Sequence, residues 1–185
     1  DSEGLKFILF KEGKDTGITF RAVPGGHEFT SLLMAVLNAD GKGKNFPDEF
    51  ITRRIKALRG PINLTTYLSL TCTNCPDVVQ TLNVMVVLNH QIRHEAVDGA
   101  INEDEVNRMK VQAVPTVFAD GEQIHVGRGS IGDLLEKLEA RYGSVELEAA
   151  ETKEYDVLVA GAGPAGATAA IYSARKGLKV AIIAE

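Results

Sequence analysis

The chain contains two cysteines, Cys72 and Cys75, which lie in the segment TCTNCP at residues 71–76. A disulfide between residues so close in sequence closes a very small loop, so it adds little to the stability of a fold. A secreted protein held together by disulfides would carry more cysteines, spread along the chain. A Cys-x-x-Cys pair between a strand and a helix is typical of redox proteins. We therefore predict reversible thiol–disulfide exchange at these two residues.

The two cysteines are expected to play different parts in this exchange. Cys72 is predicted at the N-terminus of a helix, where unpaired backbone N–H groups and the helix dipole stabilise a thiolate. Cys72 is therefore the predicted nucleophile, and Cys75, one turn further along, is predicted to be more sheltered and to resolve the mixed disulfide. Pro76 suits the first turn of the helix because it has no N–H to leave unpaired.

A structural zinc site is the alternative interpretation of a Cys-x-x-Cys pair. Such a site needs two further ligands, and the sequence has no second cysteine pair. His90, His94 and His125 lack the spacing from the cysteines that zinc sites show, and they fall on or beside predicted strands. The redox interpretation is therefore favoured, and no metal site is predicted.

A second motif, GAGPAG at residues 161–166, follows one predicted strand directly and opens a helix. In this context, Gly-x-Gly-x-x-Gly allows a tight turn, close approach of a pyrophosphate and close packing of the helix on the strand. Glu185 ends the next strand, 19 positions after the last glycine, where a ribose hydroxyl is normally held. A glycine-rich turn without a ligand remains the alternative. The residues predicted to bind the cofactor are Gly161, Gly163, Pro164, Ala165, Gly166 and Glu185.

The elements that must position these motifs follow from the pattern of apolar residues. Apolar runs at 7–10 and 18–20, separated by a turn region at 13–17, predict a hairpin, and helical spacing from 29 to 37 predicts a helix. Residues 47–142 predict the order αβαβαββα, with strands at 62–70 and 92–97 and a hairpin around Asp120-Gly121. This order predicts a mixed sheet with helices on its faces, an α/β fold.

An internal repeat is visible in this pattern. Residues 7–37 and 116–138 both give strand, turn, strand, glycine-containing link and amphipathic helix. The first copy has no cysteine and no preceding βαβ half, so we expect it to be incomplete. The predicted divisions are the closing half of a cysteine-free fold at 1–46, a redox domain at 47–142, a linker at 143–153 and the start of a nucleotide-binding domain at 154–185.

Composition narrows the class of protein further. The formal net charge of −5 argues against a general nucleic-acid surface, which needs clustered Lys and Arg. The uncharged run at 157–174 contains three glycines and a proline, so we interpret it as a nucleotide loop rather than a membrane span. No signal peptide is visible at the start of the chain. A single βαβ unit at 154–185 cannot bury both faces of its strands, so the chain is expected to be a piece of a longer protein.

The chain resembles a known family in the motifs that carry these predictions. They are GHEFTSL at 26–32, YLSLTC at 67–72, NCPDVVQ at 74–80, DVLVAGAGPAG at 156–166 and AIYSAR at 170–175. The glycine loop and the helix after it look like the FAD-binding start of thioredoxin-reductase-type flavoproteins. With a preceding Cys-x-x-Cys domain, the whole chain resembles the flavoprotein component of bacterial alkyl hydroperoxide reductase, an NADH:peroxiredoxin reductase.

This resemblance implies tandem thioredoxin-like folds, the first one incomplete here, followed by the first βαβ unit of an FAD-binding Rossmann-like domain. It implies that electrons pass from NADH to FAD, to a second disulfide, to Cys72–Cys75 and on to a peroxiredoxin, for peroxide detoxification. It further implies a cytoplasmic protein that is a homodimer at full length. Neither FAD nor NADH is expected to bind well to this chain, and the chain alone is not expected to oxidise NADH.

The resemblance also changes the interpretation of two single residues. Glu28 lies near a predicted helix start, where its ordinary role is to complement the helix dipole. In the family, an acidic residue of the Gly-His-Glu-Phe-Thr segment lies near the disulfide, which implies that Glu28 helps to move protons. Pro115 opens a predicted strand as an ordinary edge proline, whereas thioredoxin-like folds imply a cis-proline beside the disulfide. The chain differs from the family at Thr73, a position at which relatives can carry a histidine.

Two other functions remain open at this stage. The tandem module could be an adaptor that docks partners without exchange, or a general thioredoxin- or glutaredoxin-like protein disulfide reductase. The adaptor predicts that a Cys72→Ser variant still supports peroxide reduction. The general reductase predicts comparable turnover with glutathione mixed disulfides.

Overall fold

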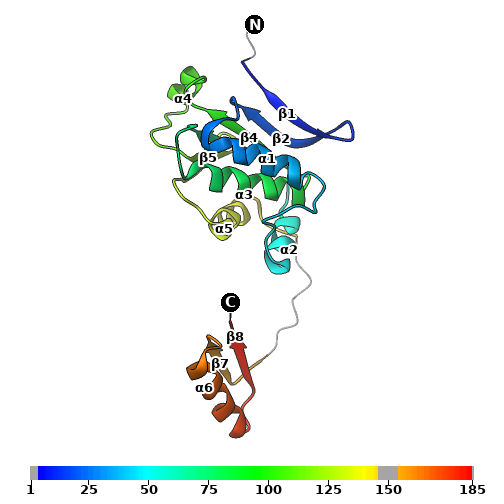
Figure 1. Ribbon diagram of the computed structural model, residues 1–185, viewed down its shortest axis with the longest axis vertical. Helices are drawn as coiled ribbons and strands as arrows, with labels where there is room; N and C mark the ends of the chain where they lie inside the picture. Colours follow the sequence, from blue (N-terminus) through cyan, green and yellow to red (C-terminus); the bar gives the residue numbers. More distant parts are fainter. Residues whose placement is uncertain (1–3, 146–153, 185) are drawn as a thin grey trace. The chain divides into compact units, whose positions relative to one another are not determined.

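The computed structural model describes residues 4–145 and 154–184, which fall into two compact units, residues 1–147 and 148–185 (Figure 1). Each unit is described by itself. Within the described residues, no helix combines the length and the apolar character needed to cross a membrane.

The first unit is built on a six-stranded mixed sheet within residues 4–145. The strand order is β1-β2-β4-β3-β5-β6, with β2, β4 and β3 parallel to one another and the remaining neighbours antiparallel. The strands are β1 (Phe7–Lys11), β2 (Lys14–Arg21), β3 (Ile62–Leu68), β4 (Ile92–Asp98), β5 (Thr116–Ala119) and β6 (Glu122–Val126). The predicted mixed sheet is confirmed.

The helices of this unit alternate with the strands as the sequence predicts for residues 47–142. They are η1 (Gly26–Glu28), α1 (Phe29–Asn38), α2 (Glu49–Ala57), α3 (Cys75–Leu88), α4 (Glu103–Arg108) and α5 (Ile131–Tyr142). Helices α1 and α3 lie side by side against the sheet (Figure 1). The hairpin–helix plan predicted twice is observed as β1-β2-α1 and β5-β6-α5.

The main core lies between the sheet and α3. The apolar residues of α3 recur at helical spacing, and this places them on the side of the helix that faces the strands. Those buried in the core are Val78, Val79, Leu82, Met85 and Val86. The core fixes the axis of α3, and with it the position of the cysteines at its N-terminal end.

The first hairpin differs from the sequence-based prediction in the place of its turn. The turn is at Glu12 and Gly13, which both have positive φ, and β2 then runs from Lys14 through Gly17. A Cβ on Gly17 would lie 3.2 Å from Val86 and 3.3 Å from the carbonyl oxygen of Ile92. Gly17 therefore belongs to the strand, where it allows close packing, and the predicted turn region at 13–17 is wrong.

The second unit is the predicted βαβ unit. Parallel strands β7 (Val157–Ala160) and β8 (Val180–Ile183) are joined through α6 (Pro164–Arg175). The last residue, Glu185, and most of the predicted linker lie outside the described residues.

Candidate functional site

The strand-to-helix turn after β3 presents Cys72. The Cys72 N–H donates to the Ser69 carbonyl oxygen at 3.0 Å, and the Ser69 and Thr71 hydroxyl oxygens lie 3.1 Å apart. Helix α3 begins at Cys75, so Cys72 lies in the turn just before the helix rather than in its first turn.

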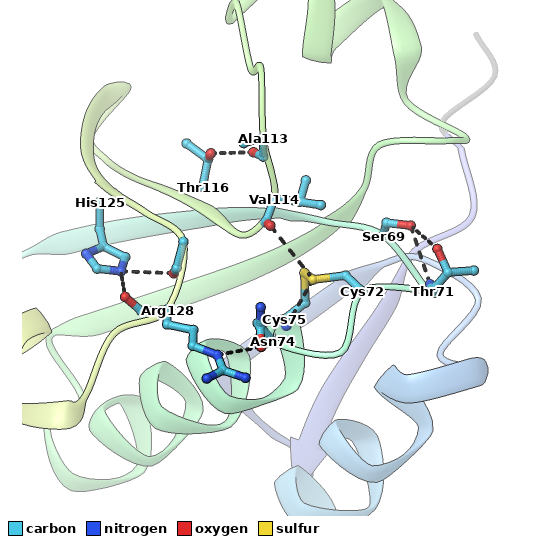
Figure 2. The surroundings of a disulfide bond; sticks show 11 residues. Ser69, Thr71, Cys72, Asn74, Cys75, Ala113, Val114, Thr116, His125 and Arg128 are labelled. Carbon is cyan, nitrogen blue, oxygen red and sulfur yellow. Dashed lines mark hydrogen bonds between the residues drawn. A yellow bond between two sulfur atoms is a disulfide. The ribbon is translucent and has the colours of Figure 1, made fainter.

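The two cysteines form a disulfide that differs in exposure at its two ends (Figure 2). Cys75 is fully buried, whereas Cys72 is partly exposed. The Cys75 N–H donates to the Cys72 sulfur at 3.1 Å. An attacking thiol can therefore reach Cys72 and not Cys75, and the first N–H of α3 is available to stabilise negative charge on the Cys72 sulfur.

A proline loop faces the disulfide from the start of β5. The Val114–Pro115 peptide bond is cis, as the family resemblance implies. The prediction from the residues alone, an ordinary edge proline, is therefore wrong. The Val114 carbonyl oxygen lies 3.8 Å from the Cys72 sulfur, and the Thr116 hydroxyl donates to the Ala113 carbonyl oxygen at 2.6 Å (Figure 2). A reduced Cys72 thiol can donate to the Val114 oxygen in this geometry.

The link between β6 and α5 reaches the same turn. Arg128 donates from Nε to the Asn74 side-chain oxygen at 2.6 Å (Figure 2). The buried His125 ring lies behind this link, with Nε2 3.0 Å from the Gly127 carbonyl oxygen and 2.9 Å from that of Arg128. An arginine from a distant segment is thus tied directly into the Cys-x-x-Cys loop.

Glu28 is fully buried at the end of η1. Neither of its carboxylate oxygens has a hydrogen-bond partner in the part of the chain that the structure describes. Burial raises its pKa to about 7, and the nearby Ser31 hydroxyl opposes this by less. The preceding His27 N–H donates to the Leu70 carbonyl oxygen at 3.1 Å, which docks η1 on the segment that leads to Cys72.

The other histidines have ordinary structural surroundings. His94 is buried, with its ring nitrogens 2.8 Å from the Thr66 hydroxyl and 2.8 Å from the Asn83 side-chain oxygen, and burial lowers its pKa to about 3. His90 is exposed at the far end of α3. Across residues 4–145 and 154–184, no three His, Cys, Asp or Glu side chains gather where they could hold a metal ion.

The glycine loop of the second unit has the geometry of a phosphate cradle. A Cβ on Gly166 would lie 2.0 Å from the Gly161 carbonyl oxygen, so only glycine lets α6 pack this closely on the loop. Gly161 has a positive φ of 99°, and a Cβ on Gly163 would meet open space. Pro164 and Ala165 open α6, whose N-terminus faces this space. These residues fit a dinucleotide pyrophosphate, while Glu185 lies outside the described residues.

Comparison with protein families agrees with both motifs. Residues 63–140, which include the disulfide and the proline loop, match the family described as "Thioredoxin domain". Residues 156–185, which include the glycine loop, match the family described as "FAD binding domain".

Similar proteins extend over the whole chain. The F subunit of alkyl hydroperoxide reductase from Pseudomonas putida is 46% identical over 186 residues, which cover 100% of this chain and 36% of that protein. A protein named NADH dehydrogenase from Bacillus subtilis (strain 168) is 45% identical, over 97% of this chain and 35% of its own length. The solved NTD_N/C domain of alkylhydroperoxide reductase AhpF from Enterococcus faecalis (V583) has a TM-score of 0.64 and 32% identity, over 68% of this chain and 60% of that one. The chain therefore spans about a third of the length of the curated relatives it matches.

The structure brings together Cys72, Cys75 and the proline loop, and it docks the segment that carries Glu28 beside them. The motifs of the sequence did not single out Asn74 or Arg128. The signal that could have found Arg128 is its place between two glycines directly after the second hairpin, in the segment equivalent to the one that carries Glu28.

Proposed function

Because this chain belongs to the family of the alkyl hydroperoxide reductase flavoprotein AhpF and spans about a third of its relatives, we propose that it is the disulfide electron carrier of an NADH- and FAD-dependent reductase of peroxiredoxins. The observation that carries the proposal is the disulfide with one accessible and one buried sulfur, beside a proline loop and in front of α3. This arrangement suits transfer of electrons to another protein's disulfide.

The exchange uses Cys72 as the attacking residue. The reduced Cys72 thiolate attacks one sulfur of the partner disulfide, a mixed disulfide forms, and the other partner sulfur leaves and takes up a proton. The Cys75 thiol then gives up its proton and attacks the Cys72 sulfur, which releases the second partner thiol. The partner gains two electrons and two protons, and the Cys72–Cys75 disulfide seen here is the product.

Glu28 is proposed to handle the proton of the buried cysteine. Cys75 is fully buried, so water cannot readily take its proton, and Glu28 is a buried carboxylate docked on the segment leading to Cys72. With a pKa of about 7, Glu28 is close to half-protonated at neutral pH, which suits a group that must both accept and release a proton. A Glu28→Gln variant should slow the resolving step and remove its dependence on pH near 7.

FAD is proposed to bind to the complete second domain. FAD would supply two electrons accepted from NADH, and Gly161, Gly163, Pro164, Ala165 and Gly166 would hold its pyrophosphate at the N-terminus of α6, with Glu185 at the ribose. NADH, a second disulfide and the remaining domains belong to the longer protein. This chain alone is therefore expected to carry electrons without oxidising NADH.

The wider setting is part of the same proposal. The partners are the peroxiredoxin and the flavin and nucleotide domains of the longer protein, which is a cytoplasmic homodimer, and neither nucleic acid nor a membrane is involved. The division into residues 1–46, 47–142, 143–153 and 154–185 is retained as a proposal, although both hairpins belong to one sheet.

A single-turnover experiment tests the proposed function. The chain is reduced with dithiothreitol, desalted and mixed with the oxidised peroxiredoxin, and new peroxiredoxin thiols are counted. The wild type should transfer two electrons per chain, Cys72→Ser none, and Cys75→Ser should accumulate a mixed disulfide. Equal rates with glutathione mixed disulfides would favour the general reductase, and peroxide reduction by the Cys72→Ser form of the full protein would favour the adaptor.

A further inference from the structure

Ser31 lies in the first turn of α1, three residues after Glu28, so the two side chains are on the same side of the helix start. Both side chains are fully buried. Within the described residues, the Glu28 carboxylate oxygens have no hydrogen-bond partner, and the Ser31 hydroxyl accepts one hydrogen bond but donates none. A buried acceptor and a buried donor are thus close together, and donation from Ser31 to the carboxylate satisfies both.

Gln80 of α3 holds the Ser31 hydroxyl from the other side. Its side-chain Nε2 donates to Ser31 Oγ at 3.4 Å and to Oγ1 of the exposed Thr30 at 3.3 Å. Because the Ser31 oxygen accepts from Gln80, the hydroxyl proton points away from the amide. The Thr30 hydroxyl donates to the His27 carbonyl oxygen at 3.0 Å. Ser31, rather than Thr30, can therefore donate to the Glu28 carboxylate.

Few charged groups face Glu28 from the elements packed around it. In η1 the neighbour is His27, which is exposed, and α1 carries no titratable side chain. Helix α3, which packs on η1, contributes the exposed Asp77 and the disulfide-bonded Cys75, and the segment on which η1 docks ends at Cys72, the other sulfur of the disulfide. Among the described residues of these elements there is thus no buried cation that could stabilise the ionised carboxylate.

We propose that Ser31 is a positioning residue for the buried base: its hydroxyl, held by Gln80, donates to the ionised Glu28 carboxylate and keeps it able to take the proton of Cys75 at neutral pH. The inference rests on the proposed role of Glu28 in the exchange and adds the group that tunes it. A hydrogen bond to a charged group favours the charged form. Consistently, burial raises the pKa of Glu28 to about 7, and the Ser31 hydroxyl acts in the opposite direction.

The first measurement titrates Glu28 by NMR in the oxidised full chain, in which Cys72 and Cys75 are joined and do not titrate. Glutamate is isotope-labelled at its side-chain carboxyl carbon, and the Glu28 signal is the one absent from Glu28→Gln. Ser31→Ala should raise the titration midpoint by about one pH unit, because the charged form loses a hydrogen bond. Gln80→Met keeps the hydroxyl but removes the amide that orients it, and should raise the midpoint by about half a unit.

Thr30→Ala is the matched control for this titration. It removes the other hydroxyl that Gln80 contacts, which is exposed and donates away from Glu28, so the midpoint should stay at the wild-type value. A wild-type midpoint in Ser31→Ala would overturn the inference. An equal shift in Thr30→Ala would also overturn it, because the shift would then not depend on the hydroxyl beside the carboxylate.

The second measurement tests whether this tuning serves the exchange. The reduced chain is mixed with dithiobis(nitrobenzoate): the Cys72 thiolate attacks the reagent's disulfide and releases one nitrobenzoate thiolate, and Cys75 then attacks the Cys72 sulfur, gives up its proton and releases the second. In Ser31→Ala, this second release should be about fivefold slower at pH 7, and its rise with pH should move up by about one unit. A shifted midpoint with an unchanged rate of second release would count against the proposed role of Glu28, and not against the bond between Ser31 and its carboxylate.

Discussion

The two hairpin–helix regions of the first unit have the same order of elements but differ in how deeply their helices are buried. In β5-β6-α5, the residues Leu134, Leu135 and Leu138 of the helix are fully buried, and Ser130 and Asp133 form a capping box. In β1-β2-α1, the helix residues Phe29, Leu33, Val36 and Leu37 are 48–55% exposed. The same order of elements therefore gives one helix, α5, whose apolar residues are buried in the core, and another, α1, whose apolar residues are partly exposed to solvent.

The links that join each hairpin to its helix differ in the charged residue that they bring to the Cys-x-x-Cys turn. Both reach the Cys-x-x-Cys turn, the first through the His27 bond to Leu70 and the second through the Arg128 bond to Asn74. The first link brings a buried acid, Glu28, and the second brings an exposed cation, Arg128. The two links thus place an acid and a cation, at different positions relative to their helices, around one disulfide.

The largest expected effect tests the difference in burial between the two helices. Leu138→Ala in α5 should lower the free energy of unfolding by about 2–5 kcal/mol, because it leaves a cavity in the core. Leu33→Ala in α1 should cost under about 1 kcal/mol, since half of that side chain is already exposed. Urea unfolding followed by circular dichroism measures both, and equal losses would contradict the comparison.

The next effect concerns the acid in the first link. Glu28 is more easily protonated in the folded chain than in the unfolded one, because burial raises its folded pKa from 4.5 to about 7. The folded state then binds more protons between these values, so its stability is greatest below pH 4.5 and falls as pH rises to 7. The fall attributable to Glu28 should be at most about 3 kcal/mol.

Glu28→Gln is the variant that isolates this effect, because it keeps the shape of the side chain and cannot ionise. Its free energy of unfolding should lack the decline between pH 4.5 and 7 that the wild type shows. Parallel curves for the two proteins across this range would show that Glu28 does not titrate in it.

The sequence correctly predicted the parts of the fold that depend on patterns among neighbouring residues. The apolar spacing in α3 and the Asp120-Gly121 turn each specify an element from neighbouring residues alone. It misplaced the first turn because Gly17 serves a contact with Val86, which lies far away in the sequence. Arg128 was missed for the same reason, since its bond to Asn74 spans 54 residues and depends on how the second hairpin packs.

A smaller effect tests whether both links need their glycines. A Cβ on Gly26 would lie 2.6 Å from the Leu70 carbonyl oxygen, and one on Gly129 would lie 2.6 Å from the His125 ring. Alanine at either position should therefore destabilise the chain by about 1–3 kcal/mol. Gly132→Ala in α5 is the control, because its Cβ meets nothing closer than 3.7 Å, and there the higher helix propensity of alanine should stabilise by up to about 1 kcal/mol.

The smallest effect concerns how the two helices begin. The Ser130 hydroxyl oxygen accepts from the Asp133 N–H at 3.2 Å, and the Asp133 carboxylate accepts from the Ser130 N–H at 2.9 Å, a bond that holds the pKa of Asp133 below its usual value. Ser130→Ala should cost about 1 kcal/mol. Helix α1 begins after Glu28, whose buried carboxylate makes no capping bond within the described chain. Thr30→Ala in its exposed first turn should cost less than Ser130→Ala, and an equal cost would mean that the cap does not distinguish the helices.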